Sequence, residues 1–258
     1  MRTFTSMSFR NILLAAAIVF TSCKQNAHLV KTETTTYPLN KPGFTEVDSS
    51  ILNSYSSYKH TIDSIMDRVI IVSEMSMQKK TPEGLLGNFT SDAALKQVEN
   101  DFHAKDFSKI DFCFLNNGGL RAALPKGDIT IGNIYSLMPF ENEMVLLTLN
   151  GATTLKLINF IAAKGGMPVS GLTMRVHEST VTEAKIQGMP FDSTKSYVVA
   201  TSDYLANGGD NLSFLADAEK KVSTGLKLRD LLIQYLEEKN KRGEKLSAKI
   251  EGRIIYDK

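Results

Sequence analysis

Hydrophobic and polar positions along this chain switch repeatedly between helical and strand spacing. Apolar residues recur at steps of three and four over 51–65, directly after the capping pair Asp48-Ser49, which predicts an amphipathic helix with one face in the core. Short apolar runs bounded by turn residues predict strands at several later points. The predicted strands cover residues 69–72, 110–115, 144–149, 172–176, 181–186, 197–201 and 253–256.

Further helices are predicted between these runs. Thr81-Pro82 is a favourable helix start, because threonine can cap a helix and proline suits the first helical position. Helical segments are also predicted over 132–137, 152–163 and 226–241. Strands follow one another after Leu172, which favours antiparallel pairing, so the pattern indicates an α+β fold: a single domain with a mixed sheet flanked by helices.

The first residues have the pattern of a secretory signal. Arg2 and Arg10 flank a start that leads into an apolar run over 11–20, which is too short to span a bilayer. Residues 20–23 (FTSC) resemble the lipobox of bacterial lipoproteins, so we expect Cys23 to carry lipid and to be the only membrane anchor. A buried N-terminal helix with an incidental cysteine is the alternative.

This interpretation divides the chain into three parts: a lipoprotein signal peptide over 1–22, a polar tether over 23–43 and a folded domain over 44–258. The folded domain is long enough to bury a substantial core. The expected location is the bacterial cell envelope, in the periplasm or at the outer membrane.

Charge and composition exclude several classes of function. A net charge of +2, from 30 basic and 28 acidic residues that are scattered along the chain, argues against a nucleic-acid binder. With Cys23 acylated, only Cys113 remains, and in its apolar run we expect it to be buried and inert. No histidine has metal-ligand spacing and no nucleophile has a paired base, so we expect no metal, cofactor or catalytic residue in this chain. The histidines are His28, His60, His103 and His177.

Two polar, glycine-containing strings predict the two sides of one small-molecule site. They cover 116–121 (NNGGLR) and 204–210 (YLANGGD). Glycine permits tight backbone close to a ligand, while the polar side chains beside it fix the ligand's orientation. The alternatives are a simple tight turn with Arg121 paired to a structural carboxylate, and Asp210 capping the helix that follows. The expected supporting residues of these loops are Gly118, Gly119, Asn207, Gly208 and Gly209.

Two aromatic residues stand at separate turns beside these strings. Phe140 belongs to the segment 139–142 (PFEN), and Tyr204 begins the second glycine loop. Two rings from different loops suit the stacking of a flat ligand between them. Packing over the core, as a lid, is the alternative for both.

From about Thr81 to Tyr256 the chain resembles the C-terminal, substrate-binding domain of the 5′-nucleotidase and UDP-sugar hydrolase family. The strings that carry the resemblance follow the family's order at similar intervals. They are Gly87-Asn88 with Asp92, Asn116 to Arg121, Pro139-Phe140 to Asn142, Tyr204 to Asp210, and Glu251-Gly252-Arg253-Ile254.

The resemblance implies a nucleoside-binding domain whose ligand is a nucleoside, a nucleotide or a nucleotide sugar. One departure weakens the expected grip on phosphate: Thr81-Pro82-Glu83 stands where the family usually has a phosphate-contacting arginine. By resemblance, Phe140 and Tyr204 stack on the base, Asp210 takes the ribose hydroxyls, Asn116 and Asn142 make polar contacts, and Arg121 reaches towards the phosphate or ribose.

Enzymes of this family also carry an N-terminal metallophosphatase domain that holds two metal ions, and its motifs are not found in this sequence. We therefore expect the substrate-binding half of a split nucleotidase, inactive alone, which works in nucleotide catabolism with a separate metallophosphatase subunit that holds the divalent metals. Two alternatives stay open: an autonomous receptor for a nucleoside or nucleotide sugar, and a structural remnant without a ligand.

Overall fold

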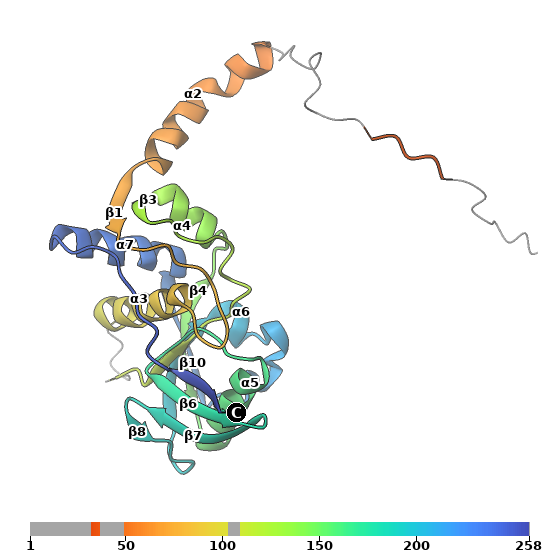
Figure 1. Ribbon diagram of the computed structural model, residues 1–258, viewed down its shortest axis with the longest axis vertical. Coiled ribbons are helices and arrows are strands. Elements are labelled where there is room, and N and C mark those ends of the chain that lie inside the picture. The colour runs from red at the N-terminus through yellow and green to blue at the C-terminus, as the bar shows by residue number, and fades with distance from the viewer. Residues whose placement is uncertain (1–31, 37–48, 103–108, 258) are drawn as a thin grey trace, which may run out of the picture. The chain divides into compact units, whose positions relative to one another are not determined.

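The apolar runs of the middle of the chain form a five-stranded mixed sheet. The computed structural model describes residues 32–36, 49–102 and 109–257 (Figure 1). In the sheet, β2 and β9 are parallel and every other neighbouring pair is antiparallel. The order of its strands is β10 (Lys220–Lys227), β4 (Glu143–Leu149), β9 (Tyr197–Ser202), β2 (Phe112–Phe114) and β5 (Val169–Ser170).

A four-stranded sheet comes mainly from the segment after β5. Its first strands pair antiparallel in succession, as predicted, while the last strand of the chain joins the edge in parallel. Its order is β11 (Ile254–Asp257), β6 (Leu172–His177), β7 (Thr180–Ile186) and β8 (Met189–Pro190), and a separate two-stranded sheet pairs β1 (Val69–Ser73) with β3 (Gly127–Thr130).

Side-chain caps mark where several helices begin. Asn150 accepts a hydrogen bond of 2.9 Å from the backbone N–H of Thr153, and Thr130 and Asn133 form a reciprocal capping box. The helices are α2 (Ser49–Met66), α3 (Leu85–Asp101), α4 (Ile131–Leu137), α5 (Gly151–Ala163), α6 (Asp203–Ala206) and α7 (Leu228–Lys241), with short 3-10 turns at Gly209–Asn211 and Ser213–Asp217.

Both faces of the five-stranded sheet are buried along its inner strands β4, β9 and β2. Along β4, Met144 and Leu146 pack into a cluster with α3 and α7, whereas Val145 and Leu147 pack into a second cluster with α5 and β6. A strand that is covered on both faces has a continuous apolar sequence, which is why the sequence predicted the inner strands β4, β9 and β2. The α+β prediction with a mixed sheet and flanking helices is confirmed.

The motif residues of α3 and of the segment that leads into β11 are joined in one hydrogen-bonded network. The Arg253 guanidinium donates to both carboxylate oxygens of Asp92 at 2.8 and 2.7 Å. Glu83 accepts from the side chain of Asn88 at 2.6 Å and from the backbone N–H groups of Glu251 and Arg253 at 2.8 and 2.9 Å. These contacts tie α3 to β11 across the chain.

Two expectations were wrong. The helix over 49–66 forms, but its apolar positions do not enter the core, because Ile51, Tyr55, Tyr58, Ile62 and Ile65 are between 42% and 72% exposed. Periodicity identifies an apolar face without identifying what covers it. The helix predicted from Thr81-Pro82 begins later, at Leu85, because extended Gly84 takes the N-cap position.

The described residues from Asn53 onward belong to one compact unit. The expected signal peptide over 1–22, Cys23 and most of the expected tether lie outside the described residues, and residues 32–36 of the tether are exposed and without regular structure. No helix among the described residues is long and apolar enough to cross a bilayer.

Candidate functional site

Three segments meet at one end of the strands of the five-stranded sheet because of the strand directions. β2 and β9 run parallel, so the segments that follow their C-terminal ends lie at the same end of the sheet. β4 runs antiparallel to β9, so the segment that leads into β4 lies at that end as well. The topology therefore brings together residues 116–121, 138–142 and 203–212.

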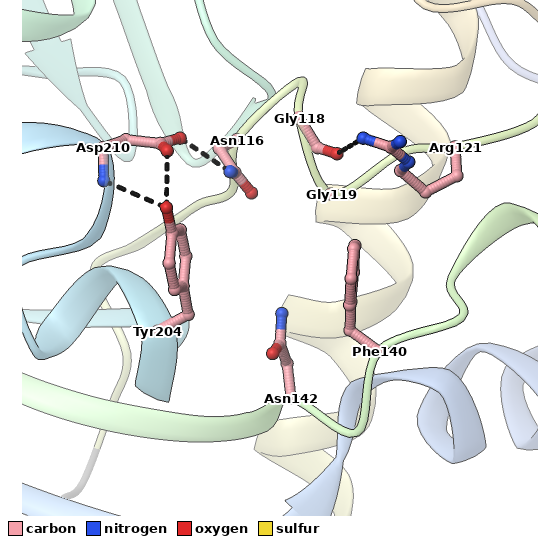
Figure 2. Close-up of a pocket in the computed structure, with 8 residues that line it drawn as sticks. All are labelled: Asn116, Gly118, Gly119, Arg121, Phe140, Asn142, Tyr204 and Asp210. Carbon is pink, nitrogen blue, oxygen red and sulfur yellow. Dashed lines mark hydrogen bonds between the residues drawn. The ribbon is translucent and has the colours of Figure 1, made fainter. Parts of the chain in front are cut away.

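These loops enclose a pocket of about 320 Å³. All six candidate ligand-binding side chains line it, together with two glycines of the first loop, although they come from segments almost one hundred residues apart (Figure 2). The lining residues are Asn116, Gly118, Gly119, Arg121, Phe140, Asn142, Tyr204 and Asp210.

One wall of the pocket is a hydrogen-bonded group of three side chains. The hydroxyl of Tyr204 donates to Oδ1 of Asp210 at 2.8 Å, and Nδ2 of Asn116 donates to Oδ2 at 2.7 Å. The bond to Asp210 raises the pKa of Tyr204 above its ordinary value. Each carboxylate oxygen has a further lone pair, which leaves Asp210 able to accept from ligand hydroxyl groups.

This arrangement excludes one alternative for the second glycine loop, in which Asp210 caps the helix that follows. Asp210 has φ of +54°, in the left-handed region, and its carboxylate bonds to Tyr204 and Asn116, not to the N-terminus of a following helix. Gly208 and Gly209, two of the expected supporting residues, must be glycine for different reasons. Gly208 has φ of +92°, and a Cβ on Gly209 would lie 2.5 Å from ring atoms of Tyr204.

The opposite wall carries Phe140 and Arg121. The Phe140 ring is 46% exposed, and Cζ of Arg121 lies 6.0 Å from its centroid. Arg121 donates a long hydrogen bond of 3.4 Å to the carbonyl oxygen of Gly118, and the described residues include no carboxylate ion-paired with it. Its remaining N–H donors are therefore available to an anionic or oxygen-rich ligand group.

The two aromatic rings lie on opposite sides of the open space, and the amide of Asn142 points into the gap between them (Figure 2). Tyr204 is 47% exposed, much like Phe140, so neither ring is a lid over the core. The arrangement suits a flat ring between two aromatic faces, with hydrogen-bonding groups at its edge.

Asp203 supports the site, and no local pattern in the sequence marked it. Its Oδ1 accepts from the backbone N–H of Tyr204 at 2.8 Å and from that of Glu143 at 3.2 Å. Ser202 caps the same short helix by accepting from the N–H of Leu205 at 3.3 Å. Asp203 thus joins the beginning of α6 to the beginning of β4, and fixes Tyr204 relative to the segment that contains Asn142.

The two other candidates for chemistry in the described residues are the thiol of Cys113 and a metal centre. Cys113 is fully buried, as predicted, and its burial raises the pKa of the thiol. Within the ranges that the structure describes, no three His, Cys, Asp or Glu side chains are grouped closely enough to hold a metal ion. The pocket lining itself offers two aromatic faces, two amides, a carboxylate and a guanidinium.

Comparison with known proteins gives one family. The family model described as "5′-nucleotidase, C-terminal domain" matches residues 62–217, more than half of the chain. The chain is 27% identical over 231 residues to the trifunctional nucleotide phosphoesterase protein YfkN of Bacillus subtilis, and 30% identical over 138 residues to the 5′-nucleotidase of Vibrio cholerae. The match covers 81% of the chain and 15% of the first protein, and 50% of the chain and 24% of the second.

A solved structure supports the same comparison. The 5′-nucleotidase precursor of Thermus thermophilus superposes with a TM-score of 0.67 and 27% identity, and the match covers 81% of this chain and 43% of that one. The chain thus spans less than half the length of each of these relatives.

Proposed function

The chain belongs to the family of 5′-nucleotidase C-terminal domains, and from this premise we propose that its pocket binds the nucleoside part of a nucleotide. The protein would serve as the substrate-binding half of a 5′-nucleotidase-type phosphohydrolase. The observation that carries the proposal is the placement of two half-exposed aromatic rings on opposite sides of one pocket that also contains a carboxylate, two amides and a guanidinium.

Each side chain has a proposed role that its contacts support. Phe140 and Tyr204 hold the base between their rings, and the amide of Asn142 lies where it can meet the edge of that base. Asp210 accepts hydrogen bonds from the ribose hydroxyl groups, with Asn116 holding one of its oxygens in place. Arg121 offers the donors of its fork to the phosphate or ribose at the rim of the pocket.

Hydrolysis is proposed to depend on a separate metallophosphatase chain. Cleavage of a phosphate ester needs groups that stabilise the transferring phosphoryl group, and in metallophosphatases divalent metal ions do this. We place the protein in nucleotide catabolism on this basis, with the nucleoside held here and the phosphate presented to the partner. The lipid anchor on Cys23 and a location in the bacterial envelope remain part of the proposal.

Isothermal titration calorimetry of the purified protein tests the binding role. Adenosine and AMP are expected to bind saturably at one site, and Phe140→Ala and Tyr204→Ala are each expected to weaken binding about tenfold. Tyr58→Ala is the matched control, because this ring is 72% exposed on α2 and is absent from the pocket lining. Absence of binding by every nucleoside and nucleotide tested would contradict the proposal.

A turnover assay tests the split between binding and hydrolysis. The purified chain with AMP and Mg²⁺ or Mn²⁺ is expected to release no phosphate, whereas adding a metallophosphatase partner is expected to start release. Metal-dependent release of phosphate by the chain alone would contradict the proposed split, and an unchanged rate after Phe140→Ala would show in addition that hydrolysis does not use the pocket.

A further inference from the structure

Arg229 is a buried arginine whose side chain ends beneath one of the loops that form the pocket. It is the second residue of α7, and its side chain is only 7% exposed. Arginine is rarely buried to this extent unless its charge and its N–H groups are matched. The groups that match it therefore indicate what the side chain holds in place.

The groups that match its two terminal nitrogens and the face of its guanidinium belong to α4 or to the loop that follows it, while Nε has no hydrogen-bond partner among the described residues. One terminal nitrogen of Arg229 lies 3.5 Å from the carbonyl oxygen of Met138 and 3.4 Å from that of Pro139. The other terminal nitrogen forms an ion pair with Glu141. The guanidinium stacks on Tyr135, with Cζ 4.1 Å from the ring centroid.

Two neighbours of Arg229 complete the attachment. Nζ of Lys227 donates to the carbonyl oxygen of Glu141 at 3.1 Å, and the backbone N–H of Leu228 donates to that of Asn142 at 2.9 Å. The start of α7 therefore contacts the loop on both sides of Phe140. The residues before it and after it are held, and its ring is left to project into the pocket (Figure 2).

We propose that Arg229 is a positioning residue that fixes the Phe140 ring and the Asn142 amide in the geometry that receives a flat ligand; its effect on affinity rests on the proposed nucleoside site. The guanidinium does not line the pocket, and it acts through the loop. A planar fork is suited to this task because it stacks on Tyr135 while it binds the two carbonyl groups and the carboxylate.

A purely structural role makes a different prediction. If Arg229 only adds stability, its loss lowers the melting temperature and leaves the binding of the folded protein unchanged. If it positions the loop, its loss changes the surroundings of residue 140 and weakens the stacking contact. Glu141 is exposed over 68% of its side chain, so replacing Arg229 leaves this carboxylate in water and not as a stranded buried charge.

The first test needs no ligand. The chain contains no tryptophan, so Phe140→Trp introduces a single tryptophan, whose emission can be excited selectively over that of the tyrosines and reports on the position of interest. Arg229→Met in this background is expected to shift the emission maximum and to change quenching by acrylamide. Arg253→Met is the matched control, because Arg253 is also a buried, ion-paired arginine but contacts Asp92 and Glu251 and not the loop. Unchanged emission after Arg229→Met would overturn the proposal.

The second test is a double-mutant cycle by calorimetry with adenosine. Arg229→Met alone is expected to weaken binding about threefold to tenfold, and to have no effect beyond about twofold once Phe140 is already alanine. Equal weakening in both backgrounds would refute action through the ring. Arg229→Lys keeps the charge without the planar fork and is expected to weaken binding less; it replaces Arg229→Met in both tests if that variant does not fold.

The two tests separate this proposal from the proposed function. If the unaltered protein binds no nucleoside, the proposed function fails, and the fluorescence comparison alone decides whether Arg229 fixes the loop. If nucleoside binds but the cycle shows no coupling and the emission does not change, the proposed function stands and the positioning role is wrong.

Discussion

Replacing Phe140 by alanine removes one side of the proposed base sandwich with little effect on the core. The ring is 46% exposed and belongs to neither buried hydrophobic cluster, so the fold is expected to persist. Stacking of a base on an aromatic side chain contributes about 1–3 kcal/mol. Because nearly half of this ring is open to water, we take about 1.5 kcal/mol, which corresponds to a dissociation constant about tenfold larger.

Calorimetry with two ligands isolates the stacking contribution. Adenosine carries the base, whereas ribose 5-phosphate carries only the groups that Asp210 and Arg121 are proposed to bind. Phe140→Ala is expected to weaken the binding of adenosine about tenfold and the binding of ribose 5-phosphate less than about twofold. Phe140→Leu keeps apolar bulk without the π-face, so its affinity for adenosine is expected to lie between that of the unaltered protein and that of Phe140→Ala.

The reasoning fails if Phe140→Ala weakens both ligands equally, because the ring would then act on the pocket as a whole and not on the base. It also fails if the affinity for adenosine does not change. Circular dichroism and the melting temperature of each variant confirm that the comparison is between folded proteins.

Four further predictions concern groups around the pocket and in the core. Tyr204→Phe keeps the ring and removes the bond to Asp210, so adenosine is expected to bind about fivefold more weakly. 2′,3′-Dideoxyadenosine, which lacks the 2′- and 3′-hydroxyl groups, is expected to bind with unchanged affinity, and equal losses for the two ligands would contradict the role of Asp210. Gly209→Ala places a Cβ 2.5 Å from the Tyr204 ring. Calorimetry is expected to show that it weakens the binding of adenosine about as much as Tyr204→Ala does. The peptide that contains Cys113 is expected to react with a thiol reagent only after denaturation, because the thiol is buried and its pKa is raised; labelling at native rates, read by mass spectrometry, would refute this. Arg229 lowers the pKa of Glu141, so the stabilisation by this ion pair is fully present above the ordinary glutamate pKa and is lost as the pH falls through the lowered pKa. The emission of the Phe140→Trp reporter is therefore expected to be constant from neutral pH to about pH 5 and to change only in stronger acid.

The sequence predicted the buried part of the fold well because β4 and β9 are covered on both faces and therefore read as apolar runs. It did not reveal β10, whose residues over Lys220–Lys227 alternate between partly buried and exposed positions at the edge of the sheet. A half-exposed edge strand needs few apolar residues, so its pattern is weak. The apolar face of α2 shows the opposite failure, since a clear pattern did not lead to burial.

The candidate site was predictable where function demands unusual residues in short strings. Glycines beside polar side chains marked the loops of Asn116 and Asp210, and the structure places both in one pocket. The supporting contacts had no such mark. Asp203 and Arg229 reach the site through hydrogen bonds between segments 60 and about 90 residues apart, and spacing along the chain carries no information about contacts of that kind.

The most direct test of the central claim is a crystal structure of the protein with adenosine bound. The account predicts that the base lies between the rings of Phe140 and Tyr204, with the ribose hydroxyls donating to Asp210. Adenosine bound elsewhere on the surface, or an empty pocket at saturating adenosine, would contradict it.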